Sequence, residues 1–288
     1  MSGLTVLEVL RRTEGFLRER GSLSARLDAE LLMARTLDVD RVGVYLAHDR
    51  PMTDDETVSM RGLVRRRGKG LPVAYLLGSK EFYGISLQVD ARVLVPRPET
   101  EGVVDRALEL LEDRPADVVD VGTGCGAIAC ALACELAQVQ VLATEIDPQA
   151  LEVAKANIAR TVPDGRVTVV QADLLGPAQP SSQDMIVSNP PYVAEGDPSL
   201  HPHVASHEPA IALYGGQDGL AIYRRLAPAA ARALKPGGWL VLELGQGQAD
   251  AVTELVEHAG LGRVDVRSDL AGIPRVLSAQ RAEQESRC

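Results

Sequence analysis

The sequence is poor in aromatic side chains and has no long hydrophobic run. Phe, Trp and Tyr make up 3% of the 288 residues, which makes aromatic platforms for stacking nucleic-acid bases hard to build. No stretch approaches the roughly 18 consecutive apolar residues of a membrane helix. Residues 1–20 also lack the basic, apolar and small-residue order of a signal peptide. We therefore expect a cytoplasmic protein with no membrane association.

Cysteine is also scarce, and its spacing argues against a metal site. Cys125, Cys130 and Cys134 fall within ten residues, and the fourth cysteine is Cys288. The sequence contains no paired Cys-x-x-Cys, the usual sign of a zinc or redox site. We therefore interpret the three clustered cysteines as reduced, buried side chains of a helix, and predict no metal site.

The negative charge is placed unevenly along the chain. Residues 1–90 hold 14 Lys and Arg against 13 Asp and Glu, whereas residues 91–288 hold 16 against 27. The acidic second part disfavours a grip on a phosphate backbone and favours proteins and small or cationic molecules as partners. The one basic run, Arg61 to Lys69, is interpreted as a solvated helix face, with contact to RNA or an acidic protein as the alternative.

The residue pattern divides the chain into three parts. Leucine spacing over residues 4–77 predicts a bundle of short helices, one of which starts after a break at Pro51 and Thr53. Residues 82–95 alternate as in a β-hairpin, with a turn predicted at Asp90-Ala91. Beyond Pro98 strands alternate with helices, which predicts a parallel sheet covered on both faces. We therefore predict a helical domain over 1–79, a hairpin linker over 80–97 and an α/β domain over 98–288.

A glycine-rich loop marks the predicted cofactor site. Asp120-Val-Gly122-Thr-Gly124-Cys-Gly126 lies between a predicted strand and a predicted helix, where glycines let the backbone approach a ligand at the helix N-terminus. Gly122-x-Gly124-x-x-Ala127 formally matches the dinucleotide fingerprint, but a carboxylate at Asp120 would repel bound phosphates. The acid instead suits a cofactor with a cationic amino group and a sulfonium, and the pattern Asp-x-Gly-x-Gly-x-Gly resembles the loop of class I S-adenosylmethionine-dependent methyltransferases.

Two later strands end in carboxylates that suit the rest of such a cofactor. Glu145 lies about twenty residues beyond the glycines, where a carboxylate accepts both ribose hydroxyls, a role available in a dinucleotide-binding fold as well. Asp147 precedes Pro148 and is instead interpreted as a helix N-cap. Asp173, followed by Leu174, is predicted to lie beside the adenine amino group.

The segment Asn189-Pro190-Pro191-Tyr192 carries the predicted chemistry. It follows a predicted strand, and its prolines donate no hydrogen bond, so their carbonyls and the Asn189 side-chain oxygen form a rigid corner of acceptors. Such a corner suits an NH2 group, on which Tyr192 would stack. We predict methyl transfer to an amide or aromatic amine, with Asn189, Pro190 and Tyr192 catalytic and Pro191 also binding substrate. Asn189 is counted among the cofactor contacts too.

Three histidines follow this segment. His201, His203 and His207 lie in a Pro-containing stretch whose spacing is not a zinc signature. We expect a mobile loop there that covers the acceptor site, with Glu208, Pro209 and the Gly215-Gly216 pair shaping its closure.

With these motifs the sequence closely resembles the HemK-type protein-(glutamine) methyltransferases, which modify peptide chain release factors. The resemblance runs over nearly the whole chain. The matching segments are Pro72 to Gly78, Glu81 to Gly84, Val95 to Glu101 (VPRPETE), Asp120 to Ala129, Ser188 to Tyr192 and Glu208 to Gly219.

The resemblance implies a fold, a cofactor and a partner. The fold is a Rossmann-like class I methyltransferase domain with a seven-stranded, mostly parallel sheet, preceded by a small helical bundle that docks the release factor and by a β-hairpin. The methyl donor is S-adenosylmethionine, which leaves as S-adenosylhomocysteine, and the acceptor is the glutamine of the release factor's Gly-Gly-Gln motif. We expect a monomer that does not itself grip nucleic acid.

The resemblance also assigns residues. The cofactor residues it implies are Gly122, Thr123, Gly124, Cys125, Gly126, Glu145, Asp173 and Leu174, with Asn189 to Tyr192 holding the glutamine. Glu145 stands where Asp is more familiar, and Leu174 where some members carry an aromatic residue. Two alternatives stay open: a methyltransferase for a nucleobase amine, and a Rossmann oxidoreductase or binding module without chemistry.

Overall fold

The computed structural model describes residues 3–283 and divides them into two compact units. Unit 1 comprises the residues up to 79 together with 201–207, and unit 2 comprises residues 80–200 and those from 208 onward. Within the described residues, no helix is long and apolar enough to cross a membrane. Cys288 lies outside them.

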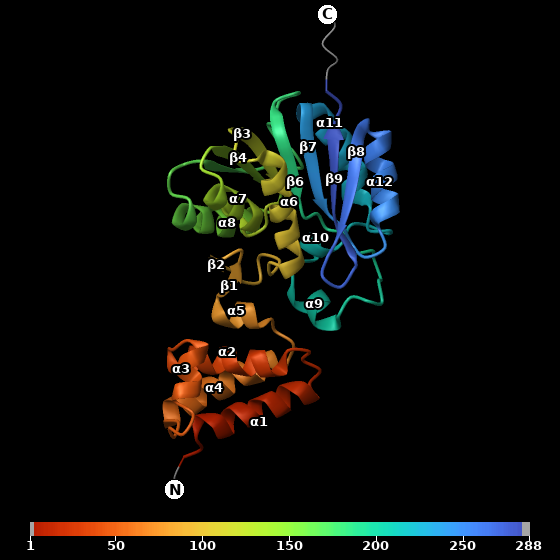
Figure 1. The fold of residues 1–288 in the computed structure, drawn as a ribbon. Helices are drawn as coiled ribbons and strands as arrows, with labels where there is room; N and C mark the ends of the chain where they lie inside the picture. The colour runs from red at the N-terminus through yellow and green to blue at the C-terminus, as the bar shows by residue number, and fades with distance from the viewer. Residues whose placement is uncertain (1–2, 284–288) are drawn as a thin grey trace, which may run out of the picture. The chain divides into compact units, whose positions relative to one another are not determined.

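Unit 1 is built from short helices around a small apolar core. The helices before its boundary are α1 (Val6–Glu19), α2 (Ala25–Leu37), α3 (Arg41–Leu46), α4 (Asp54–Arg67) and α5 (Val73–Leu77) (Figure 1). Leu17, Leu32 and Met60 are buried in one cluster between them. α4 begins as predicted, because Thr53 and Glu56 form a reciprocal capping box at its start.

The basic run belongs mostly to α4. Arg61, Arg65 and Arg66 are exposed, as a solvated helix face requires. Arg67 instead points inward, and its guanidinium pairs with the Asp28 carboxylate of α2 at 2.8 Å.

The β-hairpin exists, but its turn lies earlier than predicted. Strands β1 (Ser79–Phe82) and β2 (Ile85–Gln88) form a two-stranded sheet. The turn falls at Tyr83-Gly84, where both residues have positive φ, 49° and 71°, as tight hairpin turns require. Asp90 also starts a turn, accepting the Arg92 N–H at 3.0 Å, but the chain after it is not a strand, so the prediction of a turn between strands there is wrong.

Unit 2 contains a seven-stranded sheet in the order β5-β4-β3-β6-β7-β9-β8. The strands are β3 (Ala116–Val121), β4 (Val139–Glu145), β5 (Val167–Gln171), β6 (Gln183–Ser188), β7 (Leu234–Glu243), β8 (Leu261–Ser268) and β9 (Pro274–Arg281). Neighbouring strands are parallel except that β9 runs antiparallel to both β7 and β8. The predicted fold class is confirmed.

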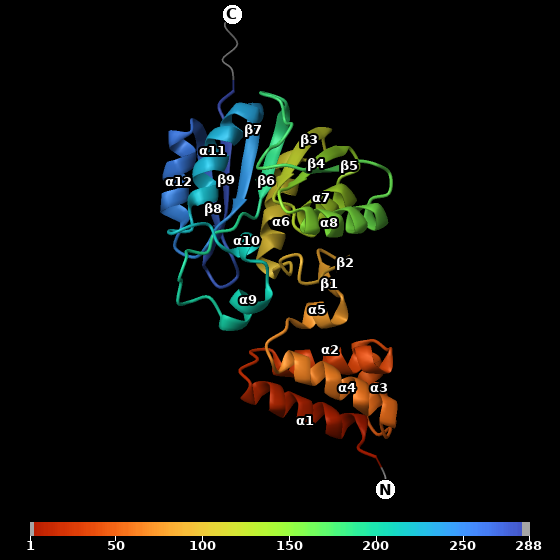
Figure 2. The same cartoon turned by 180° about the vertical axis from the view of Figure 1, so that it is seen from behind.

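Helices cover both faces of this sheet (Figures 1 and 2). α6 (Glu101–Leu111), α7 (Ala127–Glu135) and α8 (Pro148–Thr161) lie on one face, and α11 (Ala221–Ala233) and α12 (Ala249–His258) on the other. The second face has a core of strand residues packed against Tyr223, Leu226 and Val252. Three short helices complete the structure: η1 (Pro98–Thr100), α9 (Pro202–His207) and α10 (Ala210–Leu213).

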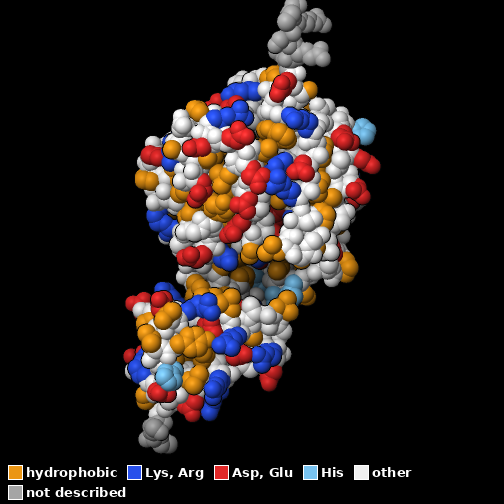
Figure 3. All heavy atoms as spheres, in the orientation of Figure 1, with side chains coloured by type: hydrophobic (Ala, Val, Ile, Leu, Met, Phe, Trp, Pro, Cys, Tyr) orange, Lys and Arg blue, Asp and Glu red, His pale blue; other side chains and the backbone are white. Residues whose placement is uncertain are grey.

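The strand order creates a crevice between β3 and β6. The chain runs outward from β3 through β4 to β5 and then returns to β6 on the other side of β3. Ligands of open α/β sheets bind at the carboxyl ends of the strands at such a switch point. On the face of unit 2 drawn in Figure 3, acidic side chains are scattered among basic ones, in keeping with the acidic balance of this part of the chain.

Candidate active site

The two predicted motifs meet at this switch point. The register places Val121, the last residue of β3, beside Ser188, the last residue of β6. The Ser188 hydroxyl donates to the Val121 carbonyl at 2.7 Å, which ties the two strand ends together. The glycine loop and the Asn189 segment therefore leave the sheet side by side and line one pocket.

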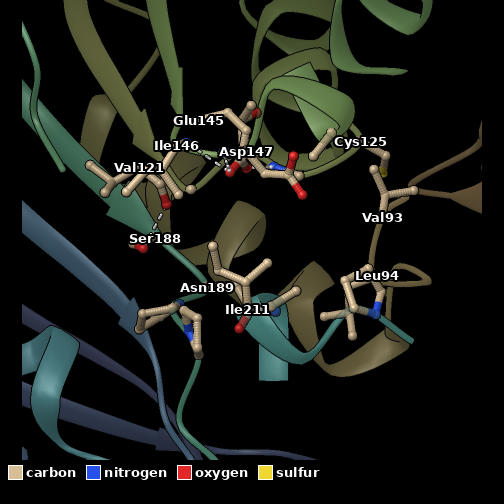
Figure 4. A pocket seen from close by; sticks show the side chains of 18 of the residues that line it. Val93, Leu94, Val121, Cys125, Glu145, Ile146, Asp147, Ser188, Asn189 and Ile211 are labelled. Carbon is tan, nitrogen blue, oxygen red and sulfur yellow. Dashed lines mark hydrogen bonds between the residues drawn. The ribbon is translucent and has the colours of Figure 1, made fainter. Parts of the chain in front are cut away.

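The pocket lies wholly within unit 2. Figure 4 shows Glu145 and Asp147 on one side of it and Val93 and Leu94 on another, with Asn189 facing the same hollow. Most predicted cofactor and substrate residues are on its wall. Three are not on it: Asp120, Gly126 and Tyr192.

The glycine loop owes its form to backbone conformation. Gly122, Gly124 and Gly126 have φ values of 68°, 58° and 86°, a region that side chains other than glycine rarely adopt. A Cβ atom at Gly122 or Gly124 would meet no atom within 4 Å. Glycine is therefore needed at these two positions for the backbone conformation of the turn, and it leaves the pocket side of the loop open. It is not needed there to avoid a clash inside the protein.

Asp120 supports the loop from behind. It is 1% exposed, and its Oδ2 accepts the Thr123 hydroxyl at 2.6 Å and the Ala129 N–H at 3.2 Å. Among the described residues, its Oδ1 is the one buried side-chain oxygen without a hydrogen-bond partner. Burial raises the pKa of this carboxyl to about 6. The structure thus gives Asp120 a bracing position, whereas the sequence interpretation had its charge facing the cofactor.

Glu145 joins the glycine loop to the end of β4. Its Oε2 accepts the Gly124 N–H at 2.9 Å, and its Oε1 accepts the N–H groups of Ile146 and Asp147 at 2.8 and 3.0 Å. This side chain is buried but lies on the pocket wall. Asp147 caps α8 as predicted, accepting the Gln149 N–H at 2.8 Å.

Asp173 and Leu174 lie on the pocket wall after β5. The Asp173 carboxylate pairs with Arg225 of α11, a contact that the sequence gave no local signal for. Leu174 has a positive φ of 51°, and its carbonyl accepts the Thr144 hydroxyl at 2.6 Å. The backbone here is therefore held in a costly conformation at the pocket edge.

The acceptor segment presents free oxygens to the pocket. The Asn189 amide nitrogen donates to the Thr100 hydroxyl at 3.0 Å. Within residues 3–283, no hydrogen bond reaches the Asn189 Oδ1 or the Pro190 carbonyl. Both residues line the pocket, so the predicted corner of acceptors has oxygens to offer an NH2 group.

Tyr192 points to a buried acid. Its hydroxyl donates to the Glu243 Oε1 at 3.1 Å, while Thr100 donates to the Glu243 Oε2 at 2.6 Å. Glu243 is 1% exposed, and burial raises the pKa of its carboxyl to about 7. Burial and this neighbouring carboxyl also raise the pKa of Tyr192. The stacking of Tyr192 on a substrate stays a prediction.

Segments distant in the sequence hold this corner together. Glu208 accepts the Val95 N–H at 3.1 Å and pairs with Arg97 at 2.6 Å. A Cβ at Gly215 would collide with the Pro191 carbonyl, and one at Gly219 with the Tyr192 carbonyl. No role was predicted for Thr100 or Glu243 from the sequence. Thr100 lies in the quoted VPRPETE segment, whereas Glu243 ends an ordinary-looking apolar strand.

The cysteines and histidines form no metal cluster among the described residues. Cys125 and Cys130 are buried as predicted, and burial raises the pKa of both thiols to about 12. Cys134 is exposed, so its predicted burial is wrong: it lies in the last turn of α7, which ends at Glu135. His203 and His207 lie in α9, which groups with unit 1, and closure over the acceptor site stays a prediction.

The pocket wall fits S-adenosylmethionine. It combines the open glycine loop, the Glu145 carboxylate at the end of β4 and the apolar side chains of Ile128 and Ile146. A nucleoside-containing donor needs hydrogen-bond acceptors for its ribose hydroxyls and apolar flanks for its base. The residues present supply both.

Comparison with known proteins agrees with this geometry. A family model described as the PrmC N-terminal domain matches residues 8–78, and one described as the methyltransferase small domain matches residues 103–205. The structure is similar to that of the hMettl16 catalytic domain, with a TM-score of 0.57 at 19% identity over 70% of this chain and 77% of that one. At that identity, the likeness supports the methyltransferase fold alone.

Two curated relatives carry the same name. The release factor glutamine methyltransferase of Geobacter sulfurreducens is 42% identical over 277 residues, covering 96% of each chain. That of Rhodopirellula baltica is 42% identical over 286 residues, covering 96% of this chain and 97% of its own. The chain therefore belongs to the release factor glutamine methyltransferase family.

Proposed function

We propose that this protein transfers the methyl group of S-adenosylmethionine to the side-chain amide nitrogen of the glutamine in the Gly-Gly-Gln motif of peptide chain release factors. The observation that carries the proposal is the corner of free acceptor oxygens at Asn189 and Pro190, which shares one pocket with the glycine loop. The names of the full-length relatives support the same substrate.

The reaction depends on placement, because an amide nitrogen is a poor nucleophile. Its lone pair is delocalised into the carbonyl, and the Asn189 segment contains no strong base. Bound S-adenosylmethionine supplies a methyl group activated by a positively charged sulfur. The Asn189 and Pro190 oxygens accept hydrogen bonds from the two N–H groups of the glutamine amide. These hydrogen bonds hold the nitrogen in line with that methyl group. Such orientation is worth up to about 7 to 11 kcal/mol.

The bonds and charges balance without another reactant. A bond forms between the glutamine nitrogen and the methyl carbon, and the bond from that carbon to sulfur breaks. The nitrogen gains positive charge as this happens, so its hydrogen bonds to the Asn189 and Pro190 oxygens strengthen. One N–H proton then leaves to solvent, giving the N-methyl amide and S-adenosylhomocysteine.

Residues on the other side of the pocket are proposed to hold the donor. Glu145 is positioned for the ribose hydroxyls, and the Asp173-Leu174 pair for the adenine. The open backbone of Gly122 to Gly126, which includes Thr123 and Cys125, would contact the remaining part of S-adenosylmethionine. Asp120 braces that loop.

The direct test is methyl transfer from labelled S-adenosylmethionine to a purified bacterial release factor. We expect label on the intact release factor and none when the motif glutamine is replaced by Ala. An RNA arm in the same experiment tests the nucleobase alternative. Label on RNA but not on the release factor would contradict the proposal.

We further propose that unit 1 docks the release factor. The match to the PrmC N-terminal domain supports this, and α3 exposes Val42 and Leu46 on successive turns, at 64% and 81%. Leu46→Asp should raise the KM for the release factor about fivefold with little change in kcat, because we place Leu46 among the minority of interface side chains whose loss costs about 1 kcal/mol or more. Leu270→Asp, at a still more exposed position of unit 2, is the control.

A further inference from the structure

A buried relay of polar side chains lies behind the acceptor corner. The Asn189 Nδ2 donates to the Thr100 Oγ1 at 3.0 Å, and that hydroxyl donates to the Glu243 Oε2 at 2.6 Å. The other carboxyl oxygen, Oε1, accepts the Tyr192 hydroxyl at 3.1 Å. Strands β6 and β7 both contribute, because their register places Ser188 beside Leu242 and so brings Asn189 next to Glu243.

Thr100 has no local capping role. It is the last residue of η1 and directly precedes α6, with helical φ and ψ of −66° and −22°. A capping residue has non-helical φ and ψ, and Thr100 accordingly makes no capping hydrogen bond. Its side chain is turned into the protein, where the residue is 4% exposed. The hydroxyl is therefore available to Asn189 and Glu243.

Glu243 is costly in its place. It is 1% exposed, and within residues 3–283 it makes no ion pair. Arg275, whose charge acts to lower the pKa of Glu243, pairs with Asp269 instead. A buried carboxyl without a cation is expensive.

The relay removes an ambiguity in the Asn189 side chain. An asparagine amide can turn about its last bond and exchange its oxygen for its nitrogen. The Thr100 hydroxyl has one proton, and it is committed to Glu243 when that carboxyl is ionised, as it is above a pKa of about 7. Thr100 can therefore only accept from Asn189, which selects the NH2 end of the amide. The Asn189 oxygen is then left for the pocket.

We propose that Thr100 and Glu243 are positioning residues for methyl transfer, fixing the Asn189 amide so that its oxygen meets the N–H of the acceptor. The inference rests on the proposed function for its kinetic consequences. It adds two residues that act through Asn189 and Tyr192 rather than by touching the reacting atoms.

The first test uses Thr100→Val and Thr100→Ser in the full chain, with Thr168→Val on the exposed face of β5 as control. Valine keeps the shape but cannot accept from Asn189, whereas serine keeps the hydroxyl. We expect Thr100→Val to lower kcat about 10- to 100-fold, with the Kd for S-adenosylmethionine within about threefold of wild type by calorimetry. Thr100→Ser should stay within about threefold of the wild-type kcat. A wild-type kcat in Thr100→Val, or equal losses in both variants, would overturn the inference.

The second test uses Glu243→Gln, with the exposed Glu254→Gln of α12 as control. A carboxylate accepts from both Thr100 and Tyr192, but a glutamine has one acceptor oxygen and one donor group, so it satisfies only one of them. We expect Glu243→Gln to lower kcat about tenfold. The kcat of the double variant Thr100→Val/Glu243→Gln should lie within about threefold of that of Thr100→Val alone. Losses that multiply would mean that the two residues act independently, which contradicts a relay.

A measurement without catalysis keeps this inference separate from the proposed function. The side-chain NH2 signals of Asn189, identified in a nitrogen-15 spectrum by their loss in Asn189→Ala, should shift in Thr100→Val and return in Thr100→Ser. Unchanged signals in Thr100→Val would overturn the relay even in an active enzyme. A wild-type protein that methylates no release factor would instead overturn the proposed function, while these signals still decide the relay.

Discussion

The two sides of the pocket are built in different ways. The cofactor side is largely local: residues 120–145 follow one another through β3, the glycine loop, α7 and β4, and backbone groups make most of its contacts. The acceptor side is assembled from side chains at positions 100, 189, 192 and 243. The local side should therefore govern binding of the methyl donor, and the assembled side should govern turnover.

The largest expected effect separates the two sides most sharply. Asn189→Ala removes the free amide oxygen and should lower kcat by about a thousandfold, the upper range for losing one preorganised group at a reacting centre. The Kd for S-adenosylmethionine should stay within about threefold. Methyl-transfer kinetics and calorimetry on the same preparation measure both quantities. Similar losses in kcat and in affinity would show that the two sides are not separable in this way.

A substitution in the glycine loop should show the reverse pattern. Gly124 has a φ of 58° and donates its N–H to Glu145. A β-branched residue in this region costs about 1 to 3 kcal/mol, so Gly124→Val should weaken cofactor binding about 10- to 100-fold. Gly62→Val on the exposed face of α4, where a Cβ meets no atom, is the control. Unchanged affinity in Gly124→Val would mean that the loop does not hold the cofactor.

The two sides also explain what sequence could predict. The glycine loop, the carboxylates Glu145 and Asp173 at or just after strand ends and the cap at Asp147 are local patterns, and the structure brings these carboxylates and Gly122 to Cys125 of the loop to one pocket. The fold class followed in the same way from alternating strands and helices. The hairpin turn was misplaced because the sequence has two turn-like segments close together, Tyr83-Gly84 and Asp90-Ala91, with only residues 85–89 between them.

Long-range partners could not be predicted from the sequence. Glu243 ends a buried apolar strand and has no motif around it, and the Arg225 partner of Asp173 lies on a helix far along the chain. Asp120 was visible in its motif, but whether a carboxylate at a strand end faces the pocket or the protein interior depends on packing. These are contacts that only the folded register creates.

Each side is backed by a buried carboxyl, and the two should affect stability in the same direction. Burial raises the pKa of Asp120 from 3.8 to about 6 and that of Glu243 from 4.5 to about 7. Between the unfolded and the folded pKa of each group, the folded chain keeps a proton that the unfolded chain has lost. These groups therefore stabilise the fold at low pH and lose that contribution as pH rises to about 7.

Asp120→Asn and Glu243→Gln should therefore each flatten part of this decline. The difference from wild type in the pH dependence of the unfolding free energy should be about 2 to 3 kcal/mol between pH 4 and 7 for each variant, since each pKa unit is worth about 1.4 kcal/mol. Urea unfolding at several pH values measures it. A pH dependence identical to wild type in both variants would show that neither carboxyl has a raised pKa.

The smallest expected effect concerns Tyr192, where the two descriptions of the acceptor side disagree. Stacking on the substrate needs the ring, whereas the relay needs the hydroxyl that Glu243 accepts. Tyr192→Phe keeps the ring and removes the hydrogen bond from the hydroxyl to the Glu243 carboxyl. We expect kcat to fall only about three- to fivefold, which is less than the full value of such a hydrogen bond, because Thr100 still holds Glu243. Tyr192→Ala removes both and should fall much further. If Tyr192→Phe turns over as fast as wild type while Tyr192→Ala is crippled, the ring acts on the substrate directly, and the acceptor side is less dependent on remote contacts than its hydrogen bonds indicate.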